Sequence, residues 1–555
     1  MGAIKHIIDS GDMLTIAISG AFVVYLALLL ALHGAAKKSG KGRAVWTAAC
    51  FLPLLLSLIH IIVFVSGSAF IYVLPHYVSI YIPAVFAALL PLLGKKKMLF
   101  RAGGAVLIAA AVALNAFFAY SQKVANYSAQ SLSDAYVSLC DYLEENYVLG
   151  EWKKADWGKL KSDGLALVRE AEKTGDTEKY YEALSAIVNS FHDGHMGLGS
   201  YGTTVDYGIK KIMEFNDYGI CLITLDSGET IVVNAAEGLE IKNGDVVTKW
   251  DGVPVAEAIE SVCPPSAESV LANERVMKTF YLSGVGGDTV DVTYVNSAGE
   301  EKTVTLAKIE GAMPRALSTY GTFTRSRADE YETKMLTESI GYMRVTAEET
   351  NALADYLAYA TGDHPVAREM FRADLRALRE QGMTKLVIDI RNNGGGYDEV
   401  ATALASLFTK EKVYAFSLGA DGAPVADRYI LPDGEFSDIE VLVLTSMRCA
   451  SAGDGLALYL SRIDGVTVAG ITDPAGINQV TGGYVYLPAG ALVTFPTGLV
   501  LDADGNPNID TDHTRQSRNP VDVRIPLDRD AALAVFGGED YELAWAIDRL
   551  SAPNS

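Results

Sequence analysis

Lys385-Leu-Val-Ile-Asp-Ile-Arg-Asn-Asn-Gly-Gly-Gly396 joins a strand of the fully buried type, Lys385–Ile390, to a polar loop that ends in three glycines. The residues after this loop keep the spacing of a helix with one apolar face. Val441–Thr445 begins a second unit of the same kind, in which a turn and a helix follow the strand. Alternating strands and helices predict an α/β fold. Such folds place their sites in loops at the carboxyl ends of strands, and both of these loops lie there.

The second loop leads into Cys449-Ala-Ser-Ala-Gly-Asp454. Ser451 opens the helix, where free amides and the positive end of the helix dipole favour a developing negative charge. Hydrolysis by a serine also needs a base and amide donors for the oxyanion. The triglycine allows a close backbone approach because it carries no Cβ. A structural alternative exists, because Ser451 and Asp454 also fit a helix-capping box.

Four uncharged apolar stretches near the N-terminus are long enough to cross a hydrocarbon core, which needs about 20 residues. They are Met13–Leu32, Trp46–Val65, Ala69–Leu93 and Ala102–Tyr120. The loops after the first and third stretches each hold four Lys/Arg, which makes them cytoplasmic by the positive-inside rule. The sequence therefore predicts a multi-pass protein of the cell membrane. Both termini, and everything after residue 120, are then extracytoplasmic, and the lipid bilayer is a partner.

Charge divides the chain at the same place. Residues 1–120 hold nine Lys/Arg and two Asp/Glu, a net charge of +7, which leaves 37 basic and 66 acidic residues in the remainder, a net of −29. Such an acidic region repels nucleic acid, so we exclude DNA and RNA as partners. The five cysteines lack CxxC spacing, and no glycine-rich nucleotide fingerprint occurs. His192 and His195 lack an evident third ligand for a metal, so the sequence predicts neither a metal nor a cofactor.

Residues 121–555 divide into three regions that differ in their pattern of apolar residues. Residues 121–200 have helical spacing, residues 201–310 form short β-like runs with turns, and residues 311–555 carry the α/β pattern. Within the β-rich region, turns at Asn243-Gly244 and Asp251-Gly252 bracket a predicted strand. This run resembles the core of PDZ domains, which add a peptide as a strand to a sheet edge. A small β-domain without a ligand is the equally weighted alternative.

The order of these motifs resembles the carboxy-terminal processing (tail-specific) serine protease family over roughly residues 130–550. The resemblance implies a crotonase-like or ClpP-like α/β catalytic core with Ser451 as the nucleophile. It also implies an oxyanion hole made by the amides of Ala452 and Gly395. Bacterial members use a lysine after the serine as the base, whereas this chain has no lysine beyond Lys412.

The sequence is more similar to the tricorn-core and interphotoreceptor retinoid-binding-protein-like branch of that family. There a histidine from the N-terminal helical region is the general base, which implies His195 here. A glutamate near the C-terminus supports the base in that branch. The equivalent stretch of this chain offers Asp510 and Asp512, and the choice between them stays open.

Three functions follow from these features. The first is a membrane-anchored serine endopeptidase that cleaves peptides or protein C-terminal tails outside the cytoplasm. The second is an inactive relative that acts as a peptide-binding sensor, because the lysine and the glutamate are missing. The third is a transporter, which ranks lowest because the four apolar stretches hold no acidic or basic residue. The sequence gives neither the substrate nor the oligomeric state.

Overall fold

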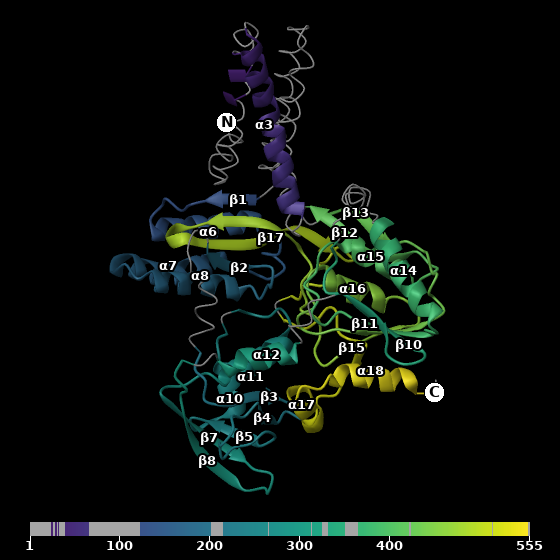
Figure 1. The fold of residues 1–555 in the computed structure, drawn as a ribbon. Coiled ribbons are helices and arrows are strands. Elements are labelled where there is room, and N and C mark those ends of the chain that lie inside the picture. Colours follow the sequence, from purple (N-terminus) through teal and green to yellow (C-terminus); the bar gives the residue numbers. More distant parts are fainter. Residues whose placement is uncertain are drawn as a thin grey trace. The chain divides into compact units, whose positions relative to one another are not determined.

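We describe the protein from a computed structural model. The structure describes residues 24–25, 28–29, 32, 39–65, 123–200, 215–264, 266–311, 314–324, 331–349, 365–420, 423–512 and 514–552. The chain divides into two compact units, Met1–Gln130 with Gly483–Leu487, and Ser131–Gly482 with Pro488–Ser555. In the first unit, helix α3 (Gly40–Val65) precedes strand β1 (Lys123–Asn126), as Figure 1 shows. β1 pairs in parallel with the end of β16 (Val480–Tyr486).

The predicted membrane helices have no support from the structure. In the part of the chain that the structure describes, no helix is both long enough and apolar enough to span a bilayer. The predicted stretch Trp46–Val65 lies within α3. Ala69–Leu93, Ala102–Tyr120 and most of Met13–Leu32 lie outside the described residues.

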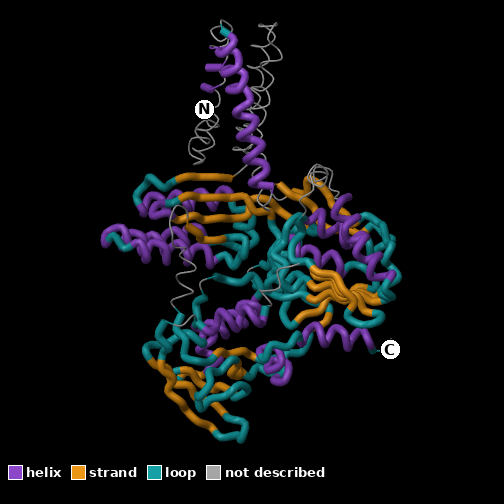
Figure 2. The backbone as a smooth tube through the Cα atoms, in the orientation of Figure 1, coloured by secondary structure: helices purple, strands orange, loops and turns teal. Residues whose placement is uncertain are grey.

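A six-stranded sheet forms the α/β core of the second unit (Figure 2). The strand order is β18 (Val523–Arg524), β15 (Val466–Gly470), β14 (Glu440–Leu444), β11 (Lys385–Asp389), β10 (Ile340–Arg344) and β9 (Glu332–Met335). Neighbouring strands are parallel except β9, which is antiparallel to β10. The predicted α/β fold is therefore confirmed, with both expected strands at its centre.

The two predicted strands are continuously apolar because helices cover both faces of the sheet. Ile388 and Val443 pack into a core with side chains of α14 (Pro365–Glu380), α15 (Asp398–Ser406) and α16 (Ala452–Ser461). Val387 and Leu442 point the other way, into a core with α12 (Arg315–Phe323), α17 (Arg529–Phe536) and α18 (Tyr541–Ser551).

The predicted helical region contains α6 (Leu132–Asn146), α7 (Trp157–Thr174) and α8 (Thr177–Ser190). Each begins with a polar side chain, Ser131, Asp156 or Asp176, that accepts a free backbone amide of the first turn. In the sequence, β1 precedes these helices and β2 (Gly197–Ser200) follows them, and neither strand was predicted. β2 pairs with β17 (Ala491–Leu501), which also pairs with β12 (Val413–Ala420), and β12 pairs with β13 (Ala423–Ile430).

The β-rich region forms a separate sheet, which we call the inserted module. Its strand order is β3 (Cys221–Thr224), β4 (Thr230–Val233), β5 (Val246–Trp250), β7 (Thr289–Val295) and β8 (Glu301–Ala307), with β6 (Val253–Pro254) beside β5. The predicted turns bracket β5, and Gly244, Asp251 and Gly252 all have positive φ. The sequence missed α10 (Val255–Ser261) and α11 (Leu271–Leu282), which lie between the predicted strands.

Helix α11 lies against β3, one of the two edge strands of the inserted module. The Leu222 N–H of β3 donates to Ser283 Oγ at 3.0 Å. The hydroxyls of Thr224 and Thr279 lie 3.2 Å apart across the same boundary. A peptide that adds to β3 would have to displace these contacts, whereas β8 is the other edge, so both the peptide-binding prediction and its alternative stay open.

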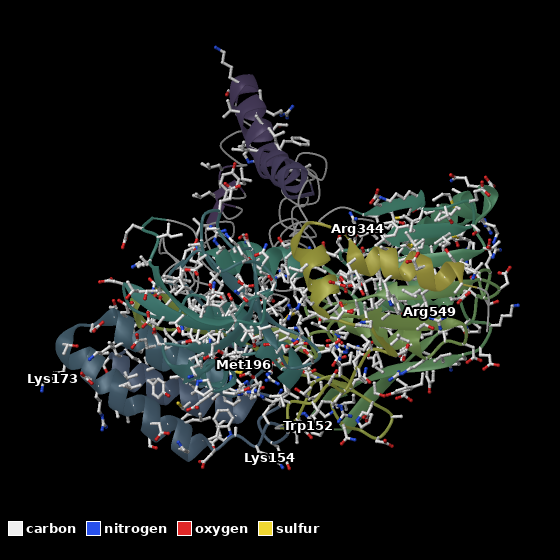
Figure 3. All side chains as sticks on the ribbon, turned by 90° about the horizontal axis from the view of Figure 1, so that it is seen from below. Trp152, Lys154, Lys173, Met196, Arg344 and Arg549 are labelled. Atoms are coloured by element: carbon white, nitrogen blue, oxygen red, sulfur yellow. The ribbon has the colours of Figure 1, made fainter. Side chains whose placement is uncertain are left out.

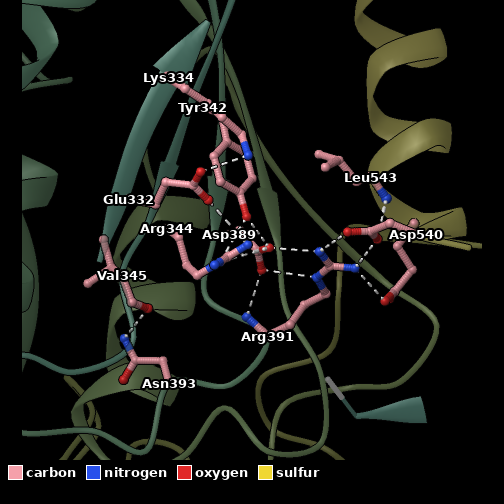
Figure 4. A network of polar contacts seen from close by, with 11 residues as sticks. Glu332, Lys334, Tyr342, Arg344, Val345, Asp389, Arg391, Asn393, Asp540 and Leu543 are labelled. Carbon is pink, nitrogen blue, oxygen red and sulfur yellow. Dashed lines mark hydrogen bonds and ion pairs between the residues drawn. The ribbon is translucent and has the colours of Figure 1, made fainter. Parts of the chain in front are cut away.

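A buried ion cluster fixes the loop after β11 (Figure 4). Arg391 is 2% exposed and lies 2.7 Å from Asp389 Oδ2, 2.7 Å from Asp540 Oδ1 and 3.0 Å from Glu542 Oε2. Burial by itself would raise the pKa of Asp389, but the Arg391 charge and hydrogen bonds bring it down to about 2. The cluster therefore ties the strand that precedes the triglycine to the start of α18.

Candidate active site

Ser451 lies at the start of α16, after the loop that leaves β14. Its backbone has φ 56° and ψ −128°, a positive φ that residues with a side chain rarely adopt. Its side chain is half-buried, and its hydroxyl is hydrogen-bonded to no described residue. Backbone strain of this kind is concentrated at functional sites. Ser451 therefore offers a free hydroxyl from a strained turn.

The capping-box alternative for Ser451 and Asp454 is wrong. Ser451 is the N-cap residue, but its side chain accepts no amide of the helix. Its own N–H donates to the Ile477 carbonyl at 3.0 Å. Asp454 Oδ2 accepts the Ile477 N–H at 3.0 Å instead of reaching back to Ser451. The first amide of the helix, that of Ala452, has no acceptor among the described residues.

The triglycine loop lies directly against Ser451. A Cβ on Gly395 would lie 2.5 Å from Ser451 Cβ and 3.0 Å from Ala452 N, and Gly395 has φ 100°. Only glycine fits such a position. The Gly395 N–H donates to Asn393 Oδ1 at 2.8 Å, whereas the Gly396 N–H has no acceptor in the described part of the chain. The two segments expected to form the oxyanion hole are thus adjacent, and Gly395 as its second donor stays a prediction.

His195 follows α8 in a turn that Asp193 holds. Asp193 Oδ1 accepts the His195 N–H at 2.9 Å, and the Asp193 carbonyl accepts the N–H of Met196, which Figure 3 labels. Asp193 Oδ2 also accepts the Tyr147 hydroxyl at 2.8 Å. The imidazole Nδ1 is buried and has no partner among the described residues. Since buried polar atoms are normally paired, this nitrogen indicates an interaction that the function completes.

Asp510 supplies the matching unpaired atom. It is fully buried, and its Oδ2 accepts the Asn478 N–H at 2.8 Å and the Gln479 Nε2 at 3.0 Å. Its Oδ1 has no partner in the described part of the structure. Burial raises the pKa of Asp510, the negative charge of Asp193 raises it further, and the nearby His195 lowers it.

The structure separates the two carboxylates that the sequence left open. Asp510 is within electrostatic reach of His195. Asp512 Oδ1 instead accepts the N–H of Thr514 at 2.9 Å and its hydroxyl at 2.5 Å. Asp510, which is buried and has an unpaired oxygen, therefore stays the predicted partner of the imidazole.

Residues 477–478 connect the three candidate segments. The Ile477 carbonyl accepts the Ser451 N–H, and the Asn478 N–H donates to Asp510. A Cβ on Gly194, next to the imidazole, would lie 2.7 Å from Ile477 Cδ1. The Ser451 hydroxyl and the His195 ring are not hydrogen-bonded to each other in this structure. Such bonds are often long in ligand-free enzymes and tighten with substrate.

The side chain that holds residues 476–477 in place was not predicted from the sequence. The buried Asp454 accepts the N–H groups of Gly476 and Ile477 through Oδ2, and Asn519 Nδ2 at 2.7 Å through Oδ1. Burial raises the pKa of Asp454 to about 8, and the charge of Asp510 adds to this rise. The only sequence signal for it is a carboxylate in the first turn of an apolar helix, which a capping role explains equally well.

The described residues contain no group of three or more His, Cys, Asp or Glu side chains that could hold a metal ion. The candidate groups of the site are a hydroxyl, an imidazole, a carboxylate and backbone amides, the kinds of group that acyl transfer uses.

Comparison with known proteins gives one family. Residues 339–515 match the family model of peptidase family S41, so this part of the chain is similar to the peptidases of that family. Its enzyme class is that of the serine peptidases, as the sequence predicted. The resemblance to carboxy-terminal processing proteases is confirmed at the level of this family, while the tricorn-like branch stays a prediction.

Solved structures with the same architecture include mature CPAF, which is 13% identical over 76% of this chain and 98% of that chain, with a TM-score of 0.53. The complex of mature CPAF with lactacystin is 14% identical over 76% and 98%, with a TM-score of 0.51. The photosystem II D1 C-terminal processing protease is 16% identical over 74% and 98%, with a TM-score of 0.34. At such identities the likeness to CPAF shows the fold. The comparison with curated proteins gave no significant match.

Proposed function

We propose that this family S41 peptidase domain is an active endopeptidase with Ser451 as the nucleophile, His195 as the general base and Asp510 as the carboxylate that orients the base. One observation carries the proposal. Three segments far apart in the sequence meet on residues 477–478, and there His195 Nδ1 and Asp510 Oδ1 are both buried without a partner.

The chemistry follows from the groups in place. Ser451 Oγ attacks the peptide carbonyl while His195 Nε2 takes its proton, and the imidazolium then donates that proton to the leaving amine. The Nδ1–H of the ring then donates a hydrogen bond to the Asp510 carboxylate, which stays ionised and stabilises the positive charge of the imidazolium. The Ala452 N–H and one triglycine amide hold the oxyanion, and each such donor contributes about 10²–10³-fold in kcat. Water then releases the acyl group from Ser451 with the same histidine as base.

A cavity beside the histidine turn offers room for a peptide. It measures about 1000 Å³ and is lined by Met196 and Leu198 on one side and by Phe215, Val262 and Lys278 of the inserted module on the other. Its lining combines apolar side chains with polar and charged ones such as His192 and Glu274, which suits an extended peptide, while Ser451 and His195 themselves do not line it in the described structure. Peptides or protein C-terminal tails are therefore the proposed substrates.

The proposed location is the outer side of the cell membrane, with the four apolar stretches of residues 1–120 as the anchor. Its support is the hydropathy of those stretches and the two basic loops between them. Separation of cell membranes, followed by protease protection of a tag at the C-terminus, tests this location. A tag that an external protease cannot reach in intact cells would contradict it.

The activity is tested with a serine-directed fluorophosphonate and a set of quenched fluorescent peptides. We expect labelling and cleavage in the wild type, neither in Ser451→Ala, and a loss of both by about 10²–10⁴-fold in His195→Ala, the range of general base catalysis. Cleavage that persists in Ser451→Ala would refute the assignment. Peptide binding without turnover in the wild type would instead favour the inactive sensor.

A further inference from the structure

Ser269–Glu274, at the start of α11, belongs to the inserted module but contacts three of the segments that build the proposed site. We propose that this segment positions the catalytic groups: it holds the His195 turn, the loop that carries Asp510 and residues 473–476, which precede Ile477, in one arrangement. The inference rests on the proposed function and adds Glu274 and Asn273 to it as positioning residues.

The first contact is with the histidine turn. Ser269 Oγ donates to the His192 carbonyl at 2.8 Å, and Glu274 Oε2 lies 3.4 Å from His192 Nδ1. His192 has φ 47°, so its conformation needs such restraint. Since His195 lies one turn further along the chain, a shift of His192 is passed on to the imidazole.

The second contact is with the segment after Asp510. The Thr511 hydroxyl donates to the Ser269 carbonyl, and the Leu271 N–H donates to the Arg515 carbonyl. Arg515 Nη2 forms an ion pair with Glu274, while Nη1 lies 2.9 Å from the His192 ring nitrogens. Arg515 therefore bridges the segments of the proposed base and the proposed carboxylate, and Glu274 holds the bridge.

The third contact is with the strip that leads to Ile477. Asn273 is fully buried, and its Nδ2 donates to the carbonyls of Asp473 at 3.1 Å and Pro474 at 2.9 Å. A Cβ on Gly476 would lie 2.6 Å from Val270 Cγ2, so the two backbones fit closely there. This strip accepts the Ser451 N–H one residue later.

Glu274 acts as a permanent negative charge. It is 6% exposed, and burial alone would raise its pKa, but His192 and Arg515 bring the pKa to about 2. Lys278 forms a further ion pair with Glu274, with Lys278 Nζ 3.2 Å from Glu274 Oε1. Salt screens a buried charge of this kind only weakly. Removing the Glu274 charge would leave Arg515 without its ion-pair partner.

The test compares Glu274→Gln with Glu300→Gln in the full chain. Glu300 is on the same module and pairs with Lys302 at 3.4 Å, but it is exposed and does not line the cavity beside the histidine turn. For Glu274→Gln we expect kcat to fall at least ~10-fold with KM within about threefold, because a misplacement of about 1 Å costs about 100-fold in rate. The acid limb of the kcat/KM profile should move to lower pH, since an imidazole that loses its carboxylate is a weaker base. Glu300→Gln should match the wild type.

Unchanged kcat and an unchanged pH profile in Glu274→Gln would overturn the inference. If that variant does not fold, Ser269→Ala, which loses one hydrogen bond to His192, decides by the same measures. A wild type that neither cleaves nor labels refutes the proposed function separately. Hydrogen exchange of residues 192–196 and 511–515 then decides: faster exchange in Glu274→Gln at an unchanged melting temperature supports the positioning role, and equal exchange refutes it.

Discussion

Three side-chain-bearing residues of the site have positive φ, His192 at 47°, Ser451 at 56° and Arg515 at 57°. Each such residue costs on the order of 1–3 kcal/mol, and the surrounding structure must supply that energy. Hydrogen bonds to the main chain do so here, from Ser451 N–H to the Ile477 carbonyl and from Leu271 N–H to the Arg515 carbonyl. The backbone of the site is therefore strained at these residues, and we expect substitutions that shift it slightly to alter the activity.

Gly395→Ala tests that sensitivity. The added methyl group would lie 2.5 Å from Ser451 Cβ at a φ of 100°, so Ser451 or the loop must move. We expect fluorophosphonate labelling to slow by about 100-fold and stability to fall by about 1–3 kcal/mol. Gly394→Ala is the matched control, because nothing lies within 4 Å of its Cβ position. Equal labelling rates in the two variants would contradict the proposed contact.

Asp510→Asn tests the choice of carboxylate. The amide keeps an acceptor for the Asn478 N–H but removes the charge that stabilises the imidazolium, so we expect kcat to fall by about 10³–10⁴. Asp512→Asn should stay within about twofold of the wild type, because asparagine keeps an acceptor for the Thr514 N–H and no charge on His195 depends on it in this assignment. Steady-state kinetics of both variants check this. The reverse order of effects would assign the role to Asp512.

At the scale of elements, the sequence predicted what depends on neighbours along the chain. Lys385–Ile390 and Val441–Thr445 became β11 and β14 because unbroken apolar runs between loops are typical of strands buried on both faces. Helix α11 was missed because its turns also bury Asn273 and Glu274, which disguise the apolar pattern. Those polar residues are buried by contacts with distant segments, and no local pattern reports such contacts.

The candidate site was predictable in its residue types and not in its assembly. Ser451 and His195 were named from motifs, but Asp510 stood beside Asp512 without a local difference. What distinguishes it is the pairing of its Oδ2 with the Asn478 N–H, which follows from the path of the chain after β17. The engaged Gly395 amide likewise depends on the rotamer of Asn393.

The ion cluster of β11 and α18 gives a prediction at this scale. Arg391→Met removes the cation from between Asp389, Asp540 and Glu542 and leaves buried carboxylates without a partner. Breaking a buried pair in this way costs about 3–5 kcal/mol. Chemical denaturation should show this loss for Arg391→Met. It should show a much smaller loss for Arg376→Met, whose pair with Glu435 is exposed.

At the scale of the whole molecule, several buried carboxyl groups link stability to pH, among them Asp454 and Glu348. Glu348 is fully buried, its Oε1 accepts Asn393 Nδ2 at 2.6 Å, and its Oε2 has no partner in the described part of the chain. Burial raises its pKa to about 8; the Asn393 hydrogen bond opposes this rise, and the charges of Asp398 and Glu349 add to it. Its backbone also contacts the triglycine loop: the Glu348 N–H donates to the Gly395 carbonyl, and the Glu348 carbonyl accepts the Tyr397 N–H. The neutral acid is therefore part of the folded site.

The sign of the pH effect follows from the two pKa values. Unfolded, Glu348 titrates near 4.3, so between about pH 4.3 and 8 the folded state binds one more proton than the unfolded state. The contribution of Glu348 to the free energy of unfolding is largest below that window and falls as pH rises through it, by at most about 1.4 kcal/mol per pH unit. Asp454, whose pKa is also raised to about 8, adds a slope of the same sign. Asp389, with its pKa lowered to about 2, adds no slope there, because its stabilisation is complete above about pH 4.

Glu348→Gln should therefore flatten this dependence. Glutamine keeps the neutral shape and the acceptor for Asn393 but has no proton to lose, so the variant should lose less stability than the wild type between pH 5 and pH 9. Melting temperatures across that range measure the effect, and the variants should diverge most at the alkaline end. Glu349→Gln, at the exposed neighbouring position, should keep the wild-type slope. Parallel curves for Glu348→Gln and the wild type would mean that Glu348 is already ionised in the folded protein, and the carboxyl group that clamps the triglycine would then carry a charge.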